Sequence, residues 1–203
     1  MNVTTVGLLV FEGCDVMDVT GPYEVFLTAA RLQLRDGGAA SFAVRTVSVD
    51  GGAVTAYGGL GLVPSHGAIA DHADLDVVIV PGLIDLDLGL ANTALLDAVR
   101  AAAGAARVSA SVCTGAFLLD AAGVLGDSPA TTHWEDAALL ADRRGATTRT
   151  LDDVRWVDAG DVVTSGGLSS GVAMALHLVA RFVSRELAEQ TARQIDYVWT
   201  ERR

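Results

Sequence analysis

One cysteine lies where the sequence predicts that a strand gives way to a helix. Cys113 follows the short run 107–112, which we expect to form a strand, and precedes Thr114, Gly115 and the helix-forming run 116–119. Such a nucleophile elbow projects its side chain from the carboxyl edge of a sheet. The first turn of the helix directs unpaired N–H groups and its positive dipole end at the sulfur. Both effects favour a thiolate, whereas a buried, inert cysteine is the alternative interpretation.

A carboxyl group is the second candidate for chemistry. Asp18 is expected in the loop after the first strand, just ahead of a helix. A carboxyl beside a thiol can exchange its proton, and a neighbouring thiolate disfavours the charged carboxylate and raises the carboxyl pKa. The alternative role for Asp18 is a helix cap or an exposed loop acid. Asp15 is expected to face solvent, and Glu24 is a weaker candidate for the site.

Other groups could assist a cysteine nucleophile. The backbone N–H of Thr114, directly after Cys113, has the usual position of an oxyanion donor, and a second donor could come from Gly82 or Leu83. His133 could join this polar cluster, or it could be a capping or surface histidine. The histidines are not spaced as a metal-ligand set, and the sequence has no phosphate-binding glycine motif, so we expect neither metal nor cofactor.

Composition limits the class of protein and its partners. The 203 residues are 51% hydrophobic and 19% charged, which favours one α/β domain over 1–203 and excludes disorder. A net charge of −11 argues against nucleic acid as a partner. No apolar segment reaches the roughly 18 residues of a membrane span, so no membrane partner is expected. Cys14 and Cys113 show neither disulfide nor zinc spacing, which favours the cytoplasm.

Strands and helices alternate along the chain. Besides the strand before Cys113, we expect strands at 3–11, 42–49 and 76–80 and hairpins at 54–63 and 155–164. Expected helices are 20–34 with Thr20 as N-cap, 92–104 capped by Asn92, one from a Thr132–Glu135 capping box to Gly145, 169–183 and 185–199. This order predicts a three-layer α/β sandwich around a mostly parallel sheet.

The candidate residues share one position relative to the predicted strands. Asp18, Gly82, Cys113 and Gly166 each follow a strand at its carboxyl end. In open parallel sheets, ligands bind beyond these ends, near the point where the strand order reverses. The sequence therefore predicts that four loops meet over one cleft.

Four segments together resemble the DJ-1/PfpI superfamily, and within it the branch that contains isocyanide hydratases. They are the segments 17–25 (MDVTGPYEV), 111–115 (SVCTG), 130–134 (ATTHW) and 164–167 (TSGG). The resemblance implies a flavodoxin-like sandwich, usually a homodimer, with Cys113 as nucleophile, Asp18 as the acid and Thr114 after the nucleophile. It also implies a cysteine-dependent hydratase that adds water to an isocyanide and releases an N-substituted formamide.

The same segments resemble the amidotransferase-like sensor domain of AraC-type regulators. A non-catalytic small-molecule or redox sensor, or a stress-response protein, is therefore the alternative function. Within the superfamily, members with protease or glyoxalase activity usually have histidine after the cysteine, and Thr114 argues against both activities here. Related sequences commonly have Pro-Gly-Gly where this chain has Pro81-Gly82-Leu83, which places a bulky side chain at the rim of the expected cleft.

Overall fold

A computed structural model describes residues 3–145 and 148–200. Its central sheet has six strands in the order β2-β1-β5-β6-β10-β9, and the first five are parallel. Only β9 is antiparallel, to β10. The strands are β1 (Thr4–Val10), β2 (Phe42–Ser48), β5 (Val77–Val80), β6 (Val108–Ser111), β9 (Trp156–Asp158) and β10 (Val162–Ser165). Strands β5, β6 and β10 are buried along their whole length, as expected for a parallel sheet covered on both faces.

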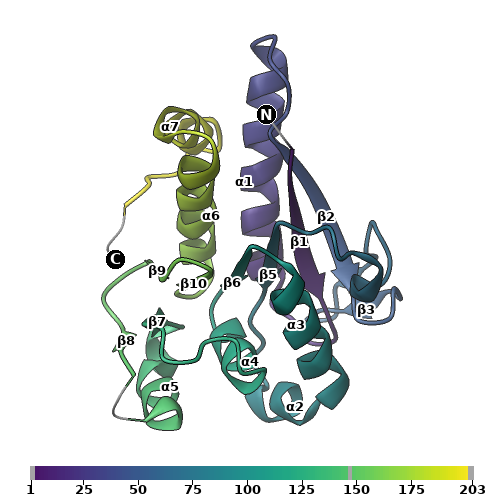
Figure 1. Ribbon diagram of the computed structural model, residues 1–203, viewed down its shortest axis with the longest axis vertical. Helices are drawn as coiled ribbons and strands as arrows, with labels where there is room; N and C mark the ends of the chain where they lie inside the picture. Colours follow the sequence, from purple (N-terminus) through teal and green to yellow (C-terminus); the bar gives the residue numbers. More distant parts are fainter. Residues whose placement is uncertain (1–2, 146–147, 201–203) are drawn as a thin grey trace.

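Helices cover both faces of this sheet (Figure 1). One group of helices that pack on each other comprises α1 (Val16–Arg35), α6 (Ser169–Phe182) and α7 (Arg185–Gln194). The other comprises η1 (Ile69–Asp71), α2 (Leu86–Ala91), α3 (Thr93–Ala105) and α4 (Gly115–Ala121). The three-layer α/β sandwich predicted from the sequence is confirmed.

Smaller elements extend the sandwich at its edges. The hairpin β3 (Val54–Thr55) and β4 (Gly61–Leu62) is antiparallel, as predicted. A second small sheet pairs β7 (Ala130–Thr131) with β8 (Thr150–Leu151) and lies beside β10 and α5 (Ala137–Arg144). The short helix η2 (Trp134–Asp136) precedes α5. The β7–β8 pair and α2 were not expected from the sequence, because strands and helices this short carry almost no periodic signal.

The first helix begins earlier than its sequence predicts. The carboxylate of Asp15 caps α1 by accepting from the Met17 amide at 2.9 Å, whereas the Thr20 hydroxyl donates to the Val16 carbonyl within the helix. The predicted Thr20 cap was therefore wrong. It relied on Pro22 belonging to the first turn, but Pro22 lies inside α1. Consequently Asp18 lies on the first turn of a helix and not in a loop.

Two further helix boundaries differ from the prediction. The Glu135 amide donates to Nδ1 of His133 at 3.4 Å, so the cap of η2 is His133 and not Thr132 as predicted. The Thr132 hydroxyl donates to the Cys113 carbonyl at 2.9 Å. The last helix ends at Gln194, not at 199, because the chain turns away where Asp196 has φ +54°. The predicted end of α5 at Gly145, with φ +82°, is confirmed.

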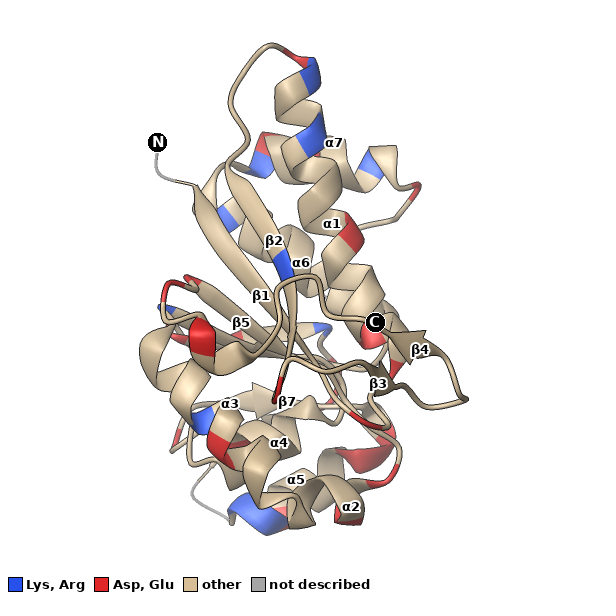
Figure 2. Ribbon diagram, turned by 90° about the vertical axis from the view of Figure 1, so that its right-hand side faces the viewer, with Lys and Arg blue, Asp and Glu red and all other residues tan. Residues whose placement is uncertain are grey.

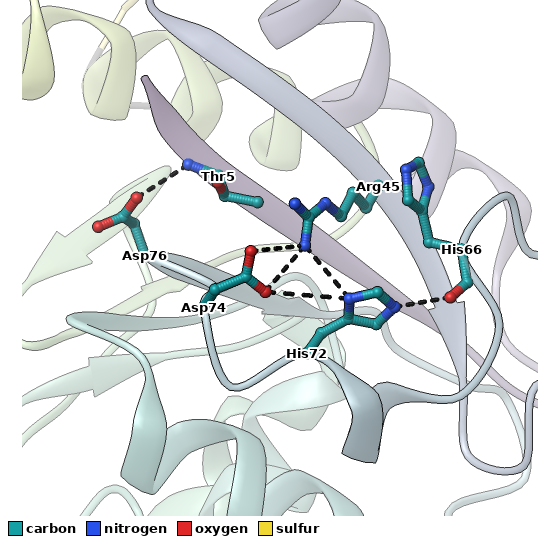
Figure 3. A network of polar contacts seen from close by, with 6 residues as sticks. All are labelled: Thr5, Arg45, His66, His72, Asp74 and Asp76. Atoms are coloured by element: carbon teal, nitrogen blue, oxygen red, sulfur yellow. Dashed lines mark hydrogen bonds and ion pairs between the residues drawn. The ribbon is translucent and has the colours of Figure 1, made fainter. Parts of the chain in front are cut away.

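A polar network fastens the loop before β5 to the edge of the sheet (Figure 3). Arg45 of β2 donates to both carboxylate oxygens of Asp74, at 2.9 and 3.0 Å, and lies 3.2 Å from Nδ1 of His72. The carboxylate of Asp76 accepts from the Thr5 amide of β1 at 2.9 Å. These contacts hold residues 72–76 in place immediately before β5, whose carboxyl end leads to Gly82.

Charged residues of both signs are spread over the fold. In the view of Figure 2, basic residues lie on α1 and α7 and also on α3 and α5, and acidic residues lie among both groups of helices. Among the residues that the structure describes, no helix is both long enough and apolar enough to cross a membrane.

The cap of α3 can be tested directly. The Asn92 side chain accepts from the Leu95 amide at 3.0 Å, as predicted. Asn92→Ala should lower the free energy of unfolding by about 1 kcal/mol, because it leaves that amide without its partner. Asn92→Asp keeps the acceptor and should remain close to wild type. Urea unfolding measures both values, and equal stability of the alanine variant and wild type would contradict the cap.

Candidate active site

Cys113 lies in a strained turn between β6 and α4. Its φ is +56°, a conformation that costs a non-glycine residue about 1–3 kcal/mol and needs support from its surroundings. The Cys113 amide donates to the carbonyls of Ser165 and Gly166, both at 3.2 Å, and its carbonyl accepts from the Thr132 hydroxyl at 2.9 Å. Segments that follow β10 and β7 therefore hold the cysteine backbone on both sides.

Asp18 is completely buried and holds its place through two backbone amides. Its Oδ2 accepts from the Gly82 amide at 3.0 Å, and its Oδ1 accepts from the Leu168 amide at 3.1 Å. Leu168 itself has a strained backbone with φ +52°. The carboxyl group therefore joins the start of α1, the loop after β5 and the loop after β10, as the four-loop prediction requires.

The Asp18 carboxyl and the Cys113 thiol lie together and alter each other's titration. Burial, and next the negative charge of Asp15, raise the pKa of Asp18 to about 7. Hydrogen bonds from the Gly82 and Leu168 amides and from the Cys113 side chain oppose this rise in the Asp18 pKa. A carboxyl with a pKa near neutrality can both accept and donate a proton at physiological pH.

The sequence left two alternatives for Cys113, a thiolate or a buried, inert thiol, and the raised pKa of Cys113 favours the protonated thiol in the resting site. Burial, and next the charge of Asp18, raise the pKa of Cys113 to about 12, although the amide and hydroxyl of Thr114 act in the opposite direction. The helix dipole favours the thiolate, but burial and the charge of Asp18 outweigh it in the folded site. In the resting site the Asp18 carboxyl therefore loses its proton before the Cys113 thiol does, and the thiol donates a hydrogen bond to the carboxylate.

Thr114 bridges the cysteine turn to the loop after β5. Its hydroxyl accepts from the Leu83 amide at 2.9 Å and donates to the Leu83 carbonyl at 2.7 Å. The amides of Gly82 and Leu83, which the sequence suggested as oxyanion donors, thus already donate to Asp18 and Thr114. Either amide would have to exchange its partner to serve a reaction intermediate, whereas the Thr114 amide already faces the sulfur.

Two glycines allow the close approach of these groups. A methyl group on Gly82 would lie 2.7 Å from Oγ1 of Thr114, 2.8 Å from Oδ2 of Asp18 and 2.9 Å from Cβ of Cys113. A methyl group on Gly167 would lie 3.2 Å from the Cys113 sulfur and would collide with the His133 ring. Hydrogen is therefore the only side chain that fits at Gly82.

The sulfur opens into a cleft of about 280 Å³. The residues that line it are Asp15, Leu83, Ile84, Leu86, Cys113, Thr114, His133, Glu135, Asp136 and Leu168. Leu83, expected as a bulky rim residue, is only 3% exposed and packs against Gly89 of α2. The described lining contains three carboxylates that reach the cleft and no arginine, so its electrostatic potential disfavours anions.

The structure also clarifies which predicted residues lie at this cleft. His133 lines the cleft. Its Nδ1 also accepts from the Glu135 amide at 3.4 Å, so it combines the capping and cleft-lining roles considered from the sequence. Glu24 does not line the cleft. Its carboxylate accepts from the Thr28 hydroxyl on α1 instead. Asp15 lines the cleft, contrary to the expectation that it faces solvent. Among the described residues, no group of His, Cys, Asp and Glu could hold a metal ion.

Replacing Gly82 tests the packing at the centre of the site. Gly82→Ala should lower the free energy of unfolding by about 1–3 kcal/mol, because the new methyl group must displace the side chains of Asp18, Thr114 and Cys113. The matched control is Gly61→Ala in β4, where the methyl group meets no atom within 4 Å. Thermal or urea unfolding compares the two variants, and equal stabilities would contradict the close approach.

The acidic lining predicts selectivity among thiol reagents. The ratio of the iodoacetate rate to the iodoacetamide rate should be lower for Cys113 than for a free thiol. In the Glu135→Gln/Asp136→Asn double variant this ratio should rise about 3- to 10-fold at low ionic strength, because two charges that repel iodoacetate are removed. Mass spectrometry of the modified protein gives both rates. Glu186→Gln/Glu189→Gln on α7 changes the net charge equally and should leave the ratio unaltered; an equal effect would assign the selectivity to net charge alone.

Comparison with known proteins agrees with this geometry. The DJ-1/PfpI family model matches residues 4–181. An isonitrile hydratase from Pseudomonas putida is 33% identical over 192 residues, which cover 95% of this chain and 78% of that protein. The HTH-type transcriptional regulator GbdR from Pseudomonas aeruginosa is 28% identical over 97% of this chain, which spans only 51% of the regulator.

A solved structure shows the same fold. A THiJ/PfpI family protein from Pseudomonas syringae superposes with a TM-score of 0.82 at 26% identity, over 97% of this chain and 76% of that one. The family model covers most of the chain, including Asp18, Gly82, Cys113 and Leu168. The chain therefore belongs to the DJ-1/PfpI family.

Proposed function

We propose that this protein is a cysteine-dependent hydratase that adds water to an isocyanide and releases an N-substituted formamide. The observation that carries the proposal is the pairing of the buried Asp18 carboxyl with the Cys113 thiol at the floor of an open cleft. The similarity to an isonitrile hydratase over 95% of the chain supports the choice of substrate class.

The first chemical step forms a covalent intermediate. Above pH 7 the Asp18 carboxylate takes the thiol proton, and the Cys113 thiolate attacks the terminal carbon of the isocyanide. Asp18 then returns that proton to the same carbon. The product is a thioimidate, in which the former isocyanide carbon carries the sulfur and one hydrogen and is doubly bonded to nitrogen. The Asp18 carboxyl serves as base and then as acid without a change in net charge.

The second step consumes water and regenerates the thiol. Water adds across the carbon–nitrogen double bond, placing its hydroxyl on carbon and its other hydrogen on nitrogen. The carbon–sulfur bond then breaks, the hydroxyl proton passes to sulfur through Asp18, and the formamide leaves. One isocyanide and one water thus give one formamide, and every proton transfer in the scheme passes through Asp18 or water.

The remaining site residues assist these steps in our proposal. The Thr114 amide, which faces the sulfur, stabilises negative charge on the thiolate. Gly82 and Leu83 keep Asp18 and Thr114 in place, with their amides as further candidate donors to the reacting group. His133 forms the wall of the cleft next to Gly167 and contacts the substrate's N-substituent.

The biological setting in this proposal follows from the resemblance and the composition. We expect a homodimer, which light scattering can test, and a reducing cytoplasm in which Cys14 and Cys113 stay free. The net charge of −11 favours a small-molecule substrate over nucleic acid.

Turnover of an isocyanide is the decisive test. Wild type, incubated with an alkyl or aryl isocyanide, should release the formamide, followed by chromatography and mass spectrometry. Cys113→Ala should be inactive. Asp18→Asn should lose at least about 100-fold in kcat/KM, because it removes proton transfer and turns an amide NH₂ toward the backbone donors. Circular dichroism and unfolding verify that each variant is folded. Absence of formamide with wild type would exclude the hydratase function for the isocyanides tried.

The pH dependence gives a second test of the same pair. Activity should rise as pH increases through about 7, because the Asp18 carboxyl, whose pKa is raised to about 7, must lose its proton before it can accept the one on sulfur. Asp15→Asn should move this rise to lower pH, since the charge of Asp15 raises the pKa of Asp18. An unchanged profile in Asp15→Asn would contradict the assignment of the acid limb to Asp18.

A sensor is the second candidate function, favoured by the 28% identity to a transcriptional regulator over 97% of this chain. A small-molecule sensor would bind an isocyanide or related ligand in the cleft without releasing product. A redox sensor is less favoured, because oxidation requires thiolate character and the pKa of Cys113 is raised to about 12. Saturable ligand binding without formamide formation would identify the non-catalytic alternative.

A further inference from the structure

The loop that carries the Leu168 amide is held in place by the segment 195–200, which follows α7. The hydroxyl of Tyr197 donates to the Ser169 carbonyl at 2.9 Å, and Ser169 directly follows the strained residue Leu168. The Arg155 guanidinium in turn donates to the Tyr197 hydroxyl at 3.0 Å. The Tyr197 hydroxyl therefore connects an arginine before β9 to the first residue of α6.

Arg155 contacts the same loop a second time, through its backbone. Its carbonyl accepts from the Gly166 amide at 2.9 Å, and the Gly166 carbonyl accepts from the Cys113 amide at 3.2 Å. Together, Arg155 and Tyr197 thus hold both ends of the loop 166–169. The middle of this loop carries the Gly167 that adjoins the cysteine sulfur and the Leu168 amide that binds Asp18.

The segment 195–200 is itself firmly placed. Asp196, with φ +54°, reverses the chain after α7, and the Tyr197 amide donates to the Ala192 carbonyl at 2.9 Å. The Trp199 indole donates to the Ala173 carbonyl of α6 at 3.1 Å and stacks on Trp156 with ring centres 6.3 Å apart. Tyr197 is therefore presented to Ser169 by an ordered support.

We propose that Tyr197, held by Arg155, is a positioning residue that fixes the loop 166–169 so that the Leu168 amide stays on the Asp18 carboxyl. It touches neither the sulfur nor the cleft, and it acts on the acid only through this loop. The inference concerns the geometry of the pair and does not depend on which substrate the site takes.

The consequence for Asp18 has a definite sign. The groups that influence its titration are Asp15, Cys113 and the amides of Gly82 and Leu168, and Cys14 lies close enough to feel its charge. A hydrogen bond to the charged carboxylate lowers the carboxyl pKa, so weakening the Leu168 bond raises it. The pH at which Asp18 can accept the thiol proton then moves upward.

Two variants of the same segment separate this role from general stability. Tyr197→Phe removes only the hydroxyl that reaches Ser169. Trp199→Phe removes a comparable hydrogen bond to α6, one turn further along the helix. The measurement is the pH titration of the Asp18 carboxyl group, followed by NMR of its carboxyl carbon, which requires no turnover and therefore stays informative even if the protein is not a hydratase.

Tyr197→Phe should shift the midpoint of the Asp18 titration upward by about 0.5–1 pH unit, while Trp199→Phe should retain the wild-type midpoint. Hydrogen exchange of the Leu168 amide should accelerate at least about tenfold in Tyr197→Phe alone. Arg155→Met should shift the midpoint in the same direction and provides the test if Tyr197→Phe does not fold. Equal midpoints in Tyr197→Phe and wild type, or equal shifts in the tyrosine and tryptophan variants, would overturn the proposal.

Discussion

Burial of the Asp18 carboxyl is the constraint on which the rest of the site depends. A buried carboxylate is costly unless hydrogen-bond donors reach it, and besides the Cys113 thiol its donors here are two backbone amides from loops distant in sequence. Each loop must pass close to the helix start, which demands glycine at position 82 and a strained backbone at Leu168. The conformations of these loops are therefore set by the needs of one side chain.

The parallel sheet makes this convergence possible. Strands β1, β5, β6 and β10 all end at the same edge, and the residues that follow them reach a common point without long connections. The cysteine turn uses the hydrogen-bonding groups of its neighbours: its amide binds the end of β10, and its carbonyl binds the Thr132 hydroxyl after β7. The strain at Cys113 is thereby distributed over several elements and is not carried by α4 alone.

The sequence was sufficient for the architecture and for the central pair. Apolar runs, alternation of strands with helices and the junction at Cys113 predicted the sandwich, and position after a strand predicted that Asp18 and Gly82 lie together beside Cys113. Electrostatics could not be predicted in the same way. The expectation of a thiolate considered local dipoles, whereas burial and the charge of Asp18 depend on residues almost a hundred positions away.

Residues were missed where their role depends on tertiary contacts. Asp15 looks like a solvent-facing loop acid until α1 is seen to begin directly after it, although an Asp just ahead of a helix is a recognisable cap signal. Leu168 binds Asp18 through its backbone amide, which any residue type could supply. Tyr197 lies beyond the end of α7, where the sequence predicted a continuous helix. Pairwise contacts between distant segments leave no periodic pattern in a single sequence.

The 150 residues between Asp18 and Leu168 also bear on how the protein acquires its chemistry during synthesis. A ribosome releases the N-terminal part first, so β1 and α1 emerge long before the strand and loop that complete the second hydrogen bond to the carboxyl group. A nascent chain that ends after Cys113 but before Leu168 contains both the acid and the thiol, but the acid lacks one of its two backbone donors. Assembly of the reactive pair is therefore coupled to the synthesis of β10 and the loop after it, and a shorter nascent chain does not expose a finished reactive centre to the cell.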